Sequence, residues 1–148
     1  MKPQSFFSRI LVCVEDSACA NKALIRACDL ARRNNSKLFL IYVVYNPTSG
    51  SGLGIKLIDR GEFVKMFRDY GKKVLKKAST IATENGVKAI PVMKEGNVAT
   101  EIIKFAKKER IDLIAIGSRG LSRLPRYILG SISNKIANYA PCQVLVVK

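Results

Sequence analysis

Two glycines and a Gly-Ser pair near the C-terminus form the most specific chemical pattern in this sequence. Gly117 and Gly120 follow a short apolar run, and nine residues separate Gly120 from Gly130-Ser131. Glycines just past a strand, with a Gly-Ser pair opening the next helix, bring several backbone N–H groups into one small region, where α/β proteins hold phosphate. Gly117 and Gly120 would let the backbone approach phosphate oxygens closely and adopt positive φ where needed. The pattern predicts a phosphate-binding segment.

The side chains around these glycines have chemistry that suits an anion. Hydroxyl donors and positive charges are supplied by Ser118, Ser122, Arg119, Arg123 and Arg126. Gly130-Ser131 would present the N–H groups of the last helix, each favourable contact between an anion and a helix end being worth about 0.3–1 kcal/mol. Glu15, after the first apolar run, is acidic in an otherwise basic pocket, so ribose hydroxyls or a divalent metal are its expected partners.

The sequence also excludes several kinds of site. It has no histidine, which removes Ser-His and Cys-His catalysis and any Cys/His zinc site. Neither a GxxxxGK[ST] phosphate loop nor a GxGxxG after the first strand occurs. No CxxC pair is formed by the cysteines, which are expected to be small buried hydrophobes at least at Cys13 and Cys142.

Composition places the chain among ordinary globular proteins with a strongly basic surface. It has 148 residues, 48% of them hydrophobic, and a formal net charge of +15. We expect one domain over residues 1–148, in the cytoplasm, because no apolar run approaches the roughly 18 residues of a membrane span and the N-terminal apolar run is too short for a secretion signal. The charge predicts attraction to polyanions in general.

Apolar periodicity predicts alternating strands and helices. The strands are expected at Ile10–Val14, Lys37–Val44, Lys88–Met93, Ile111–Ile116 and Gln143–Val147. Ser17 and Asn97 are expected to cap helices, the first of which ends near Asn34-Asn35. The other helices are expected at Glu62–Glu84 and Ser131–Tyr139, and residues 46–61 form a flexible loop.

Buried strands that alternate with helices imply an open five-stranded parallel sheet, covered by helices on both faces. Right-handed crossovers with one reversal favour the order 3-2-1-4-5. The switch point then falls between the first and fourth strands, where ligands bind in such sheets. Glu15 and the segment from Gly117 to Gly120 should therefore flank one crevice. The alternative is that these glycines only make turns and Ser131 only starts a helix; their convergence favours binding.

On these residues the chain resembles the universal stress protein family over nearly its whole length. Gly117, Gly120, Gly130 and Ser131 match the family motif G-x2-G-x9-G-[S/T] without a gap. The resemblance implies that this chain belongs to the branch of the family that binds ATP, often together with Mg or Mn. It also implies that Cys13 and Val43 lie near base and ribose, and that ribose and phosphates are held by Gly117, Ser118, Arg119, Gly120, Leu121, Ser122, Arg123, Gly130, Ser131, Ile132 and Ser133. Glu15 stands where the family usually has Asp.

The function expected from this resemblance is an ATP-binding stress-response module with slow hydrolysis at most. A metal, if present, would be held mainly by the nucleotide phosphates, and no catalytic residue is assigned. The family also dimerises through its final strand, and an apolar outermost strand from Gln143 to Val147 would favour pairing with a second copy. Two alternatives remain open: a dimeric stress protein without nucleotide, and a basic protein that binds polyanions or nucleic acid non-specifically.

Overall fold

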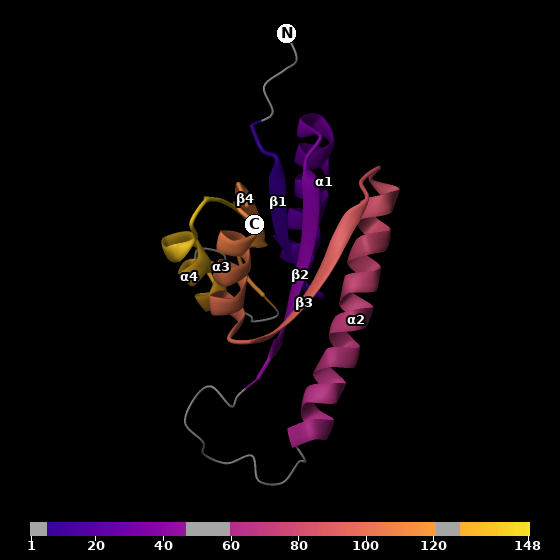
Figure 1. The fold of residues 1–148 in the computed structure, drawn as a ribbon, viewed down its shortest axis with the longest axis vertical. Helices are drawn as coiled ribbons and strands as arrows, with labels where there is room; N and C mark the ends of the chain where they lie inside the picture. Colours follow the sequence, from indigo (N-terminus) through magenta and orange to yellow (C-terminus); the bar gives the residue numbers. More distant parts are fainter. Residues whose placement is uncertain (1–5, 47–59, 121–127) are drawn as a thin grey trace.

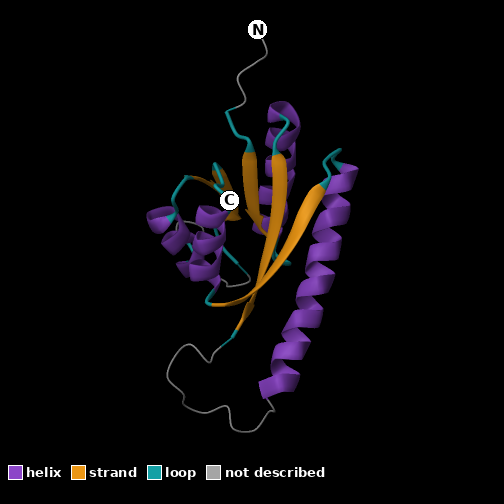
Figure 2. Cartoon of the chain, viewed as in Figure 1, coloured by secondary structure: helices purple, strands orange, loops and turns teal. Residues whose placement is uncertain are grey.

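The computed structural model describes residues 6–46, 60–120 and 128–148, and within these ranges strands alternate with helices (Figures 1 and 2). In chain order the elements are β1 (Arg9–Cys13), α1 (Ala18–Asn34), β2 (Lys37–Tyr45), α2 (Arg60–Glu84), β3 (Ala89–Gly96), α3 (Val98–Lys108), β4 (Leu113–Gly117), α4 (Ser131–Tyr139) and β5 (Gln143–Val147). Among the described residues, no helix is both long and apolar enough to cross a membrane.

The strands form one parallel sheet in the order β3-β2-β1-β4-β5, which confirms the order predicted from the sequence. β1 lies at its centre, with Ile10 opposite Leu38 of β2 and opposite Leu113 of β4. From β1 the chain builds outward through β2 and β3 on one side, and through β4 and β5 on the other. The carboxyl ends of β1 and β4 therefore border the point where the strand order reverses.

Helices cover both faces of the sheet, each over its own hydrophobic cluster. α1 and α2 pack on one face, and α3 and α4 on the other (Figure 1). Successive residues of a strand point to opposite faces, so Ile10, Val12 and Val14 pack toward α1 and α2, whereas Leu11 and Cys13 pack toward α3 and α4. This alternation makes neighbouring residues at a strand end line different sides of the sheet edge.

Local signals in the sequence set the helix ends. The Ser17 hydroxyl accepts a hydrogen bond from the Ala20 N–H at 3.2 Å, and the Asn97 side chain accepts one from the Thr100 N–H at 3.1 Å. Asn35 ends α1 in the left-handed region with φ of 54°. Ser and Asn side chains readily cap the start of a helix, and Asn tolerates the left-handed region at a helix end. These predicted helix limits are confirmed.

The fourth strand begins later than the sequence predicted. Arg110 has φ of 52°, and the Ile111 N–H still bonds to the Ala106 carbonyl at the end of α3. The Asp112 carboxylate accepts hydrogen bonds from the backbone N–H groups of Ser8 and Arg9, both at 2.8 Å. Ile111 thus helps to end α3, and Asp112 joins the amino ends of β1 and β4. The pairing of β4 with β1 starts at Leu113.

Two other limits differ from the prediction by more than one residue. β3 continues to Gly96 because β2 pairs with it as far as Tyr45. α2 begins at Arg60, so the last two residues of the segment expected as a loop, 46–61, belong to the helix. Residues 47–59 of that segment lie outside the described residues.

Candidate functional site

The carboxyl ends of β1, β2 and β4 border a cavity of about 440 Å³. That volume lies within the roughly 300–1,000 Å³ common for small-molecule sites. The cavity lies where the sequence predicted a crevice, and residues far apart in the chain meet there. Of the residues predicted for the site, those that line it are Cys13, Glu15, Val43, Gly117, Gly120, Gly130, Ser131, Ile132 and Ser133.

The remaining predicted site residues divide into two groups. Ser118 and Arg119 do not belong to the cavity lining. Ser118 is buried, with its hydroxyl 3.9 Å from the Cys19 sulfur of α1 and its N–H bonded to the Val147 carbonyl at 2.8 Å. Ser118 therefore packs between β5 and α1. Leu121, Ser122 and Arg123, and Arg126 with them, lie outside the described residues.

Gly117 has a packing role that the sequence did not reveal. It is the last residue of β4 and pairs with Val147 of β5, so it lies within the strand and not after it. A Cβ added there would lie 2.8 Å from the Ala20 nitrogen and 2.9 Å from the Cys19 carbonyl carbon. Both are backbone atoms that cannot move aside cheaply. The first turn of α1 therefore lies directly against Gly117, and glycine is required for that contact.

Gly120 lies against the Glu15 carboxylate. A Cβ at Gly120 would be 3.1 Å from Oε2 of Glu15, and the Ser17 hydroxyl donates to Oε1 at 2.9 Å. Burial raises the pKa of Glu15, while the Ser17 hydrogen bond opposes the rise. Burial, with the charge of Glu15 second, also raises the pKa of the neighbouring Cys13 thiol, which stays protonated. Glu15 thus lies between the β1 end and the glycine segment, as the predicted strand order requires.

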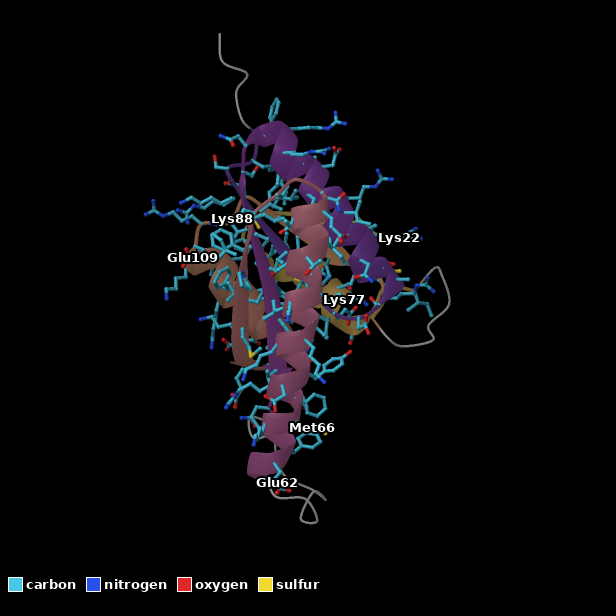
Figure 3. The ribbon with its side chains drawn as sticks, turned by 90° about the vertical axis from the view of Figure 1, so that its right-hand side faces the viewer. Lys22, Glu62, Met66, Lys77, Lys88 and Glu109 are labelled. Carbon is cyan, nitrogen blue, oxygen red and sulfur yellow. The ribbon has the colours of Figure 1, made fainter. Side chains whose placement is uncertain are left out.

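Asp16 also lines the cavity, but it is held by an ion pair. Its Oδ1 accepts a hydrogen bond from Lys77 Nζ of α2 at 2.8 Å. Figure 3 labels Lys77 on the face of α2 that is turned toward the viewer. The Asp16–Lys77 pair connects the β1–α1 turn to α2. Among the described lining residues the charged side chains are Glu15 and Asp16, both acidic.

The start of α4 borders the cavity with backbone donors. Gly130 is the N-cap residue and, within the described part of the chain, no side chain caps this helix. The first N–H groups of a helix have no acceptor within it, so those of Ser131, Ile132 and Ser133 are available to a ligand. The Ser133 hydroxyl donates to the Gly117 carbonyl at 2.7 Å, which fixes this helix end against β4. An anion is the natural partner of such a helix end.

Much of the lining consists of apolar and aromatic residues that the site prediction did not include. On the α3 side these are Ile41, Ile116, Val98 and Ile102, and on the α2 side they are Val14, Tyr42, Phe67 and Tyr70. The apolar spacing along α2 and α3 indicated their inward faces in the sequence. It did not indicate that those faces extend past the sheet edge and form cavity walls.

The described residues contain no group of three or more histidine, cysteine or carboxylate side chains that could hold a metal ion. Glu15 and Asp16 are the carboxylates at the cavity, and Asp16 is already paired with Lys77. The arrangement fits a metal carried by a ligand's own phosphates better than one held by the protein alone.

A doubly wound parallel sheet with a ligand-sized cavity at the switch point defines a Rossmann-like α/β protein. This chain belongs to the universal stress protein family, since residues 6–148 match the family model. It is 34% identical over 148 residues to the universal stress protein YxiE of Bacillus subtilis, covering 96% of this chain and 99% of that protein. Its fold is similar to that of UspA from Lactobacillus plantarum, with a TM-score of 0.83, 24% identity, and coverage of 99% of this chain and 100% of that one.

Some structures with this fold contain adenine nucleotides. One is a universal stress protein in complex with cAMP, with a TM-score of 0.75, 20% identity, and coverage of 97% of this chain and 99% of that one. Others are a universal stress protein from Archaeoglobus fulgidus in complex with dAMP and one from Arabidopsis thaliana with AMP bound, with TM-scores of 0.71 and 0.69. Each is 20% identical to this chain, so the likeness shows the fold alone.

Proposed function

We propose that this universal stress protein binds an adenine nucleotide in the cavity at the carboxyl ends of β1, β2 and β4. The observation that carries the proposal is the meeting of three features at that cavity: the uncapped start of α4, Gly120 beside the Glu15 carboxylate, and an apolar wall from β2 and α3. A nucleotide has a phosphate, a ribose and a flat apolar base, and the three features fit these parts in turn. The family members that contain cAMP, dAMP and AMP support the same ligand class.

The proposed roles follow from position. Gly120, Gly130 and the N–H groups of Ser131, Ile132 and Ser133 face the phosphates, and Glu15 accepts from the ribose hydroxyls. Cys13 and Val43 lie on the α3 side, where the base would contact the apolar wall. Leu121, Ser122 and Arg123 are assigned to the phosphates from the family motif, and Gly117 and Ser118 support the site through packing.

We further propose that the nucleotide is ATP, with Mg or Mn held mainly by its phosphates. Without histidine, and with Asp16 paired to Lys77, hydrolysis would depend on the metal and on positioning alone. Slow turnover at most is expected. The protein then acts as a regulatory binding module of one domain in the cytoplasm, and not as an efficient enzyme.

Thermal unfolding with and without ligand tests nucleotide binding. ATP with Mg²⁺ at one hundred times its dissociation constant should stabilise the fold by about 2.7 kcal/mol. For a chain of this length the midpoint should rise by roughly 5–10 °C. No saturable rise at millimolar ATP would refute the proposal.

A pair of valine substitutions separates the site from the scaffold. Gly120→Val places methyl groups against the Glu15 carboxylate, at the phosphate side of the cavity. It should abolish most of the ATP-dependent rise and leave the ligand-free midpoint nearly unchanged, because the contacted atoms end a flexible side chain. Ala137→Val on the exposed face of α4 is the matched control and should keep the full rise.

We also propose a homodimer formed through β5. This strand lies at the sheet edge, and its apolar residues Val144 to Val147 are only half buried within one chain. Exposed apolar edges favour pairing with another strand. Light scattering at micromolar concentration should give twice the 16.4 kDa mass of one chain. Val147→Lys, which places a charge on the edge at a residue outside both core clusters, should give monomers with an unchanged circular dichroism spectrum. A monomeric parent protein would contradict the dimer.

A further inference from the structure

The cavity extends over both faces of the sheet. Its lining includes Cys13, Ile41 and Val43, which belong to the α3/α4 cluster, and Val14 and Tyr42, which pack with the α1/α2 cluster. Neighbouring strand residues point to opposite faces, so one cavity can have both sets only where it passes over the sheet edge. Glu15, Gly120 and the start of α4 line the same cavity, and Glu15 lies against Gly120. The proposed nucleotide base uses only the α3 side.

The α2 side is an aromatic compartment formed by Tyr42, Phe67 and Tyr70. The rings of Tyr42 and Tyr70 meet edge to face, with centroids 6.2 Å apart and planes at 66°. Phe67 is held in turn by Phe63, at 4.7 Å and 61°. Tyr70 is 40% exposed, so part of its ring remains available for contact. Aromatic rings that are fixed by neighbours and remain partly exposed are suited to stack on a planar group.

Gly71 explains how Tyr42 reaches this position. A Cβ on Gly71 would lie 2.5 Å from Cδ1 and 2.6 Å from Cε1 of Tyr42. The missing side chain lets the Tyr42 ring lie directly against the backbone of α2, beside Tyr70. Burial, with the charges of Tyr70 and Glu15 as smaller contributions, raises the pKa of Tyr42, so its hydroxyl stays neutral at neutral pH. Glycine inside a helix ordinarily costs stability relative to alanine. At position 71 glycine is required because any side chain would collide with the Tyr42 ring.

We infer that the Tyr42–Phe67–Tyr70 compartment binds a second planar ring, so that the cavity accepts a ligand with two such rings joined by a phosphate chain. This inference rests on the proposed nucleotide function and names the ligand class for the same site. One base lies on the α3 side, the phosphates pass Gly120 and the start of α4, and the second base stacks on Tyr70. A dinucleoside polyphosphate has this chemistry. A mononucleotide leaves the aromatic compartment unused.

Two ligands that have the same phosphate chain but differ in the number of adenosines test the inference. Calorimetric titration compares diadenosine tetraphosphate with adenosine 5′-tetraphosphate, which lacks the second adenosine. Stacking of one base on an aromatic side chain corresponds to a gain of roughly tenfold in affinity, so the first ligand should bind about tenfold more tightly. Tyr70→Leu should reduce the ratio to near one and leave the affinity for adenosine tetraphosphate within about twofold.

Two further variants keep the test specific. Tyr70→Phe retains the ring and should retain the ratio, and Tyr139→Leu changes a tyrosine that is 72% exposed on α4 outside the cavity lining. Equal affinities of the parent protein for the two ligands would overturn the second-ring compartment while leaving nucleotide binding intact. A Tyr70→Leu variant that weakens both ligands equally would overturn it as well. If neither ligand bound, the proposed nucleotide function would itself fail, and the inference with it.

Discussion

Ile136→Ala is expected to lower the free energy of unfolding by about 2–5 kcal/mol, the range for deleting most of a large buried aliphatic side chain. Ile136 is fully buried on α4 and packs in the cluster between the sheet, α3 and α4. α4 has only nine residues, and Ser133 and Ile136 are its buried residues, so this contact is a large part of what docks the helix. Urea unfolding followed by circular dichroism measures the loss.

Ile132→Ala is the matched control on the same helix. Ile132 lies one turn before Ile136, is 39% exposed and lines the cavity. Its truncation should cost less than about 1 kcal/mol of stability, as partly exposed side chains lose little transfer free energy. If both variants lost equal stability, α4 would not be docked in the manner described. A selective effect of Ile132→Ala on nucleotide affinity would add support to the proposed site.

Among the three glycines that line the cavity, Gly117, Gly120 and Gly130, Gly117→Ala should be the most damaging change to alanine. The added methyl group would meet backbone atoms of Cys19 and Ala20 at under 3 Å, so α1 or β4 must shift. Overpacking of this kind costs about 1–3 kcal/mol, and we expect the upper end because neither contact is a movable side chain. The thermal midpoint without ligand should fall by several degrees, by roughly 2–4 °C per kcal/mol.

Gly120→Ala provides the comparison for Gly117→Ala. Its Cβ meets only the end of the Glu15 side chain, at 3.1 Å. The ligand-free midpoint should change little, because the carboxylate can rotate away. If Gly120→Ala destabilised the fold as much as Gly117→Ala, the division between a packing glycine and a cavity glycine would be wrong.

Much of the fold follows from local sequence rules. Alternating apolar runs and amphipathic segments predicted the parallel sheet and its order, since right-handed crossovers leave few arrangements. Ser17, Asn35 and Asn97 end or begin helices as their side chains favour. The same order predicted that Glu15 and Gly120 would meet, and their contact depends only on which strands are neighbours.

What could not be predicted depends on contacts between distant segments. Ile111 and Asp112 look like strand residues, but the Asp112 carboxylate binds backbone N–H groups of residues 8 and 9, and no local pattern reveals that. Gly117 matched a phosphate motif, yet its closest contacts are with α1. Tyr42, Phe67 and Tyr70 looked like ordinary core positions. Periodicity shows which face of a helix or strand a residue is on, but it does not show whether that face lies over the sheet or extends past the sheet edge into the cavity.

The central position of β1 has a consequence for synthesis of the chain. Its first partner, β2, follows closely, but its other neighbour is β4, and Arg9 meets Asp112 across 103 residues of sequence. Until the ribosome has released β4, one side of β1 is an open, apolar edge, although Ile10, Leu11 and Val12 are fully buried in the finished protein. Such late pairing slows folding and exposes nascent chains to aggregation. The cavity, which is lined in part by α4, is completed only after α4 has been made.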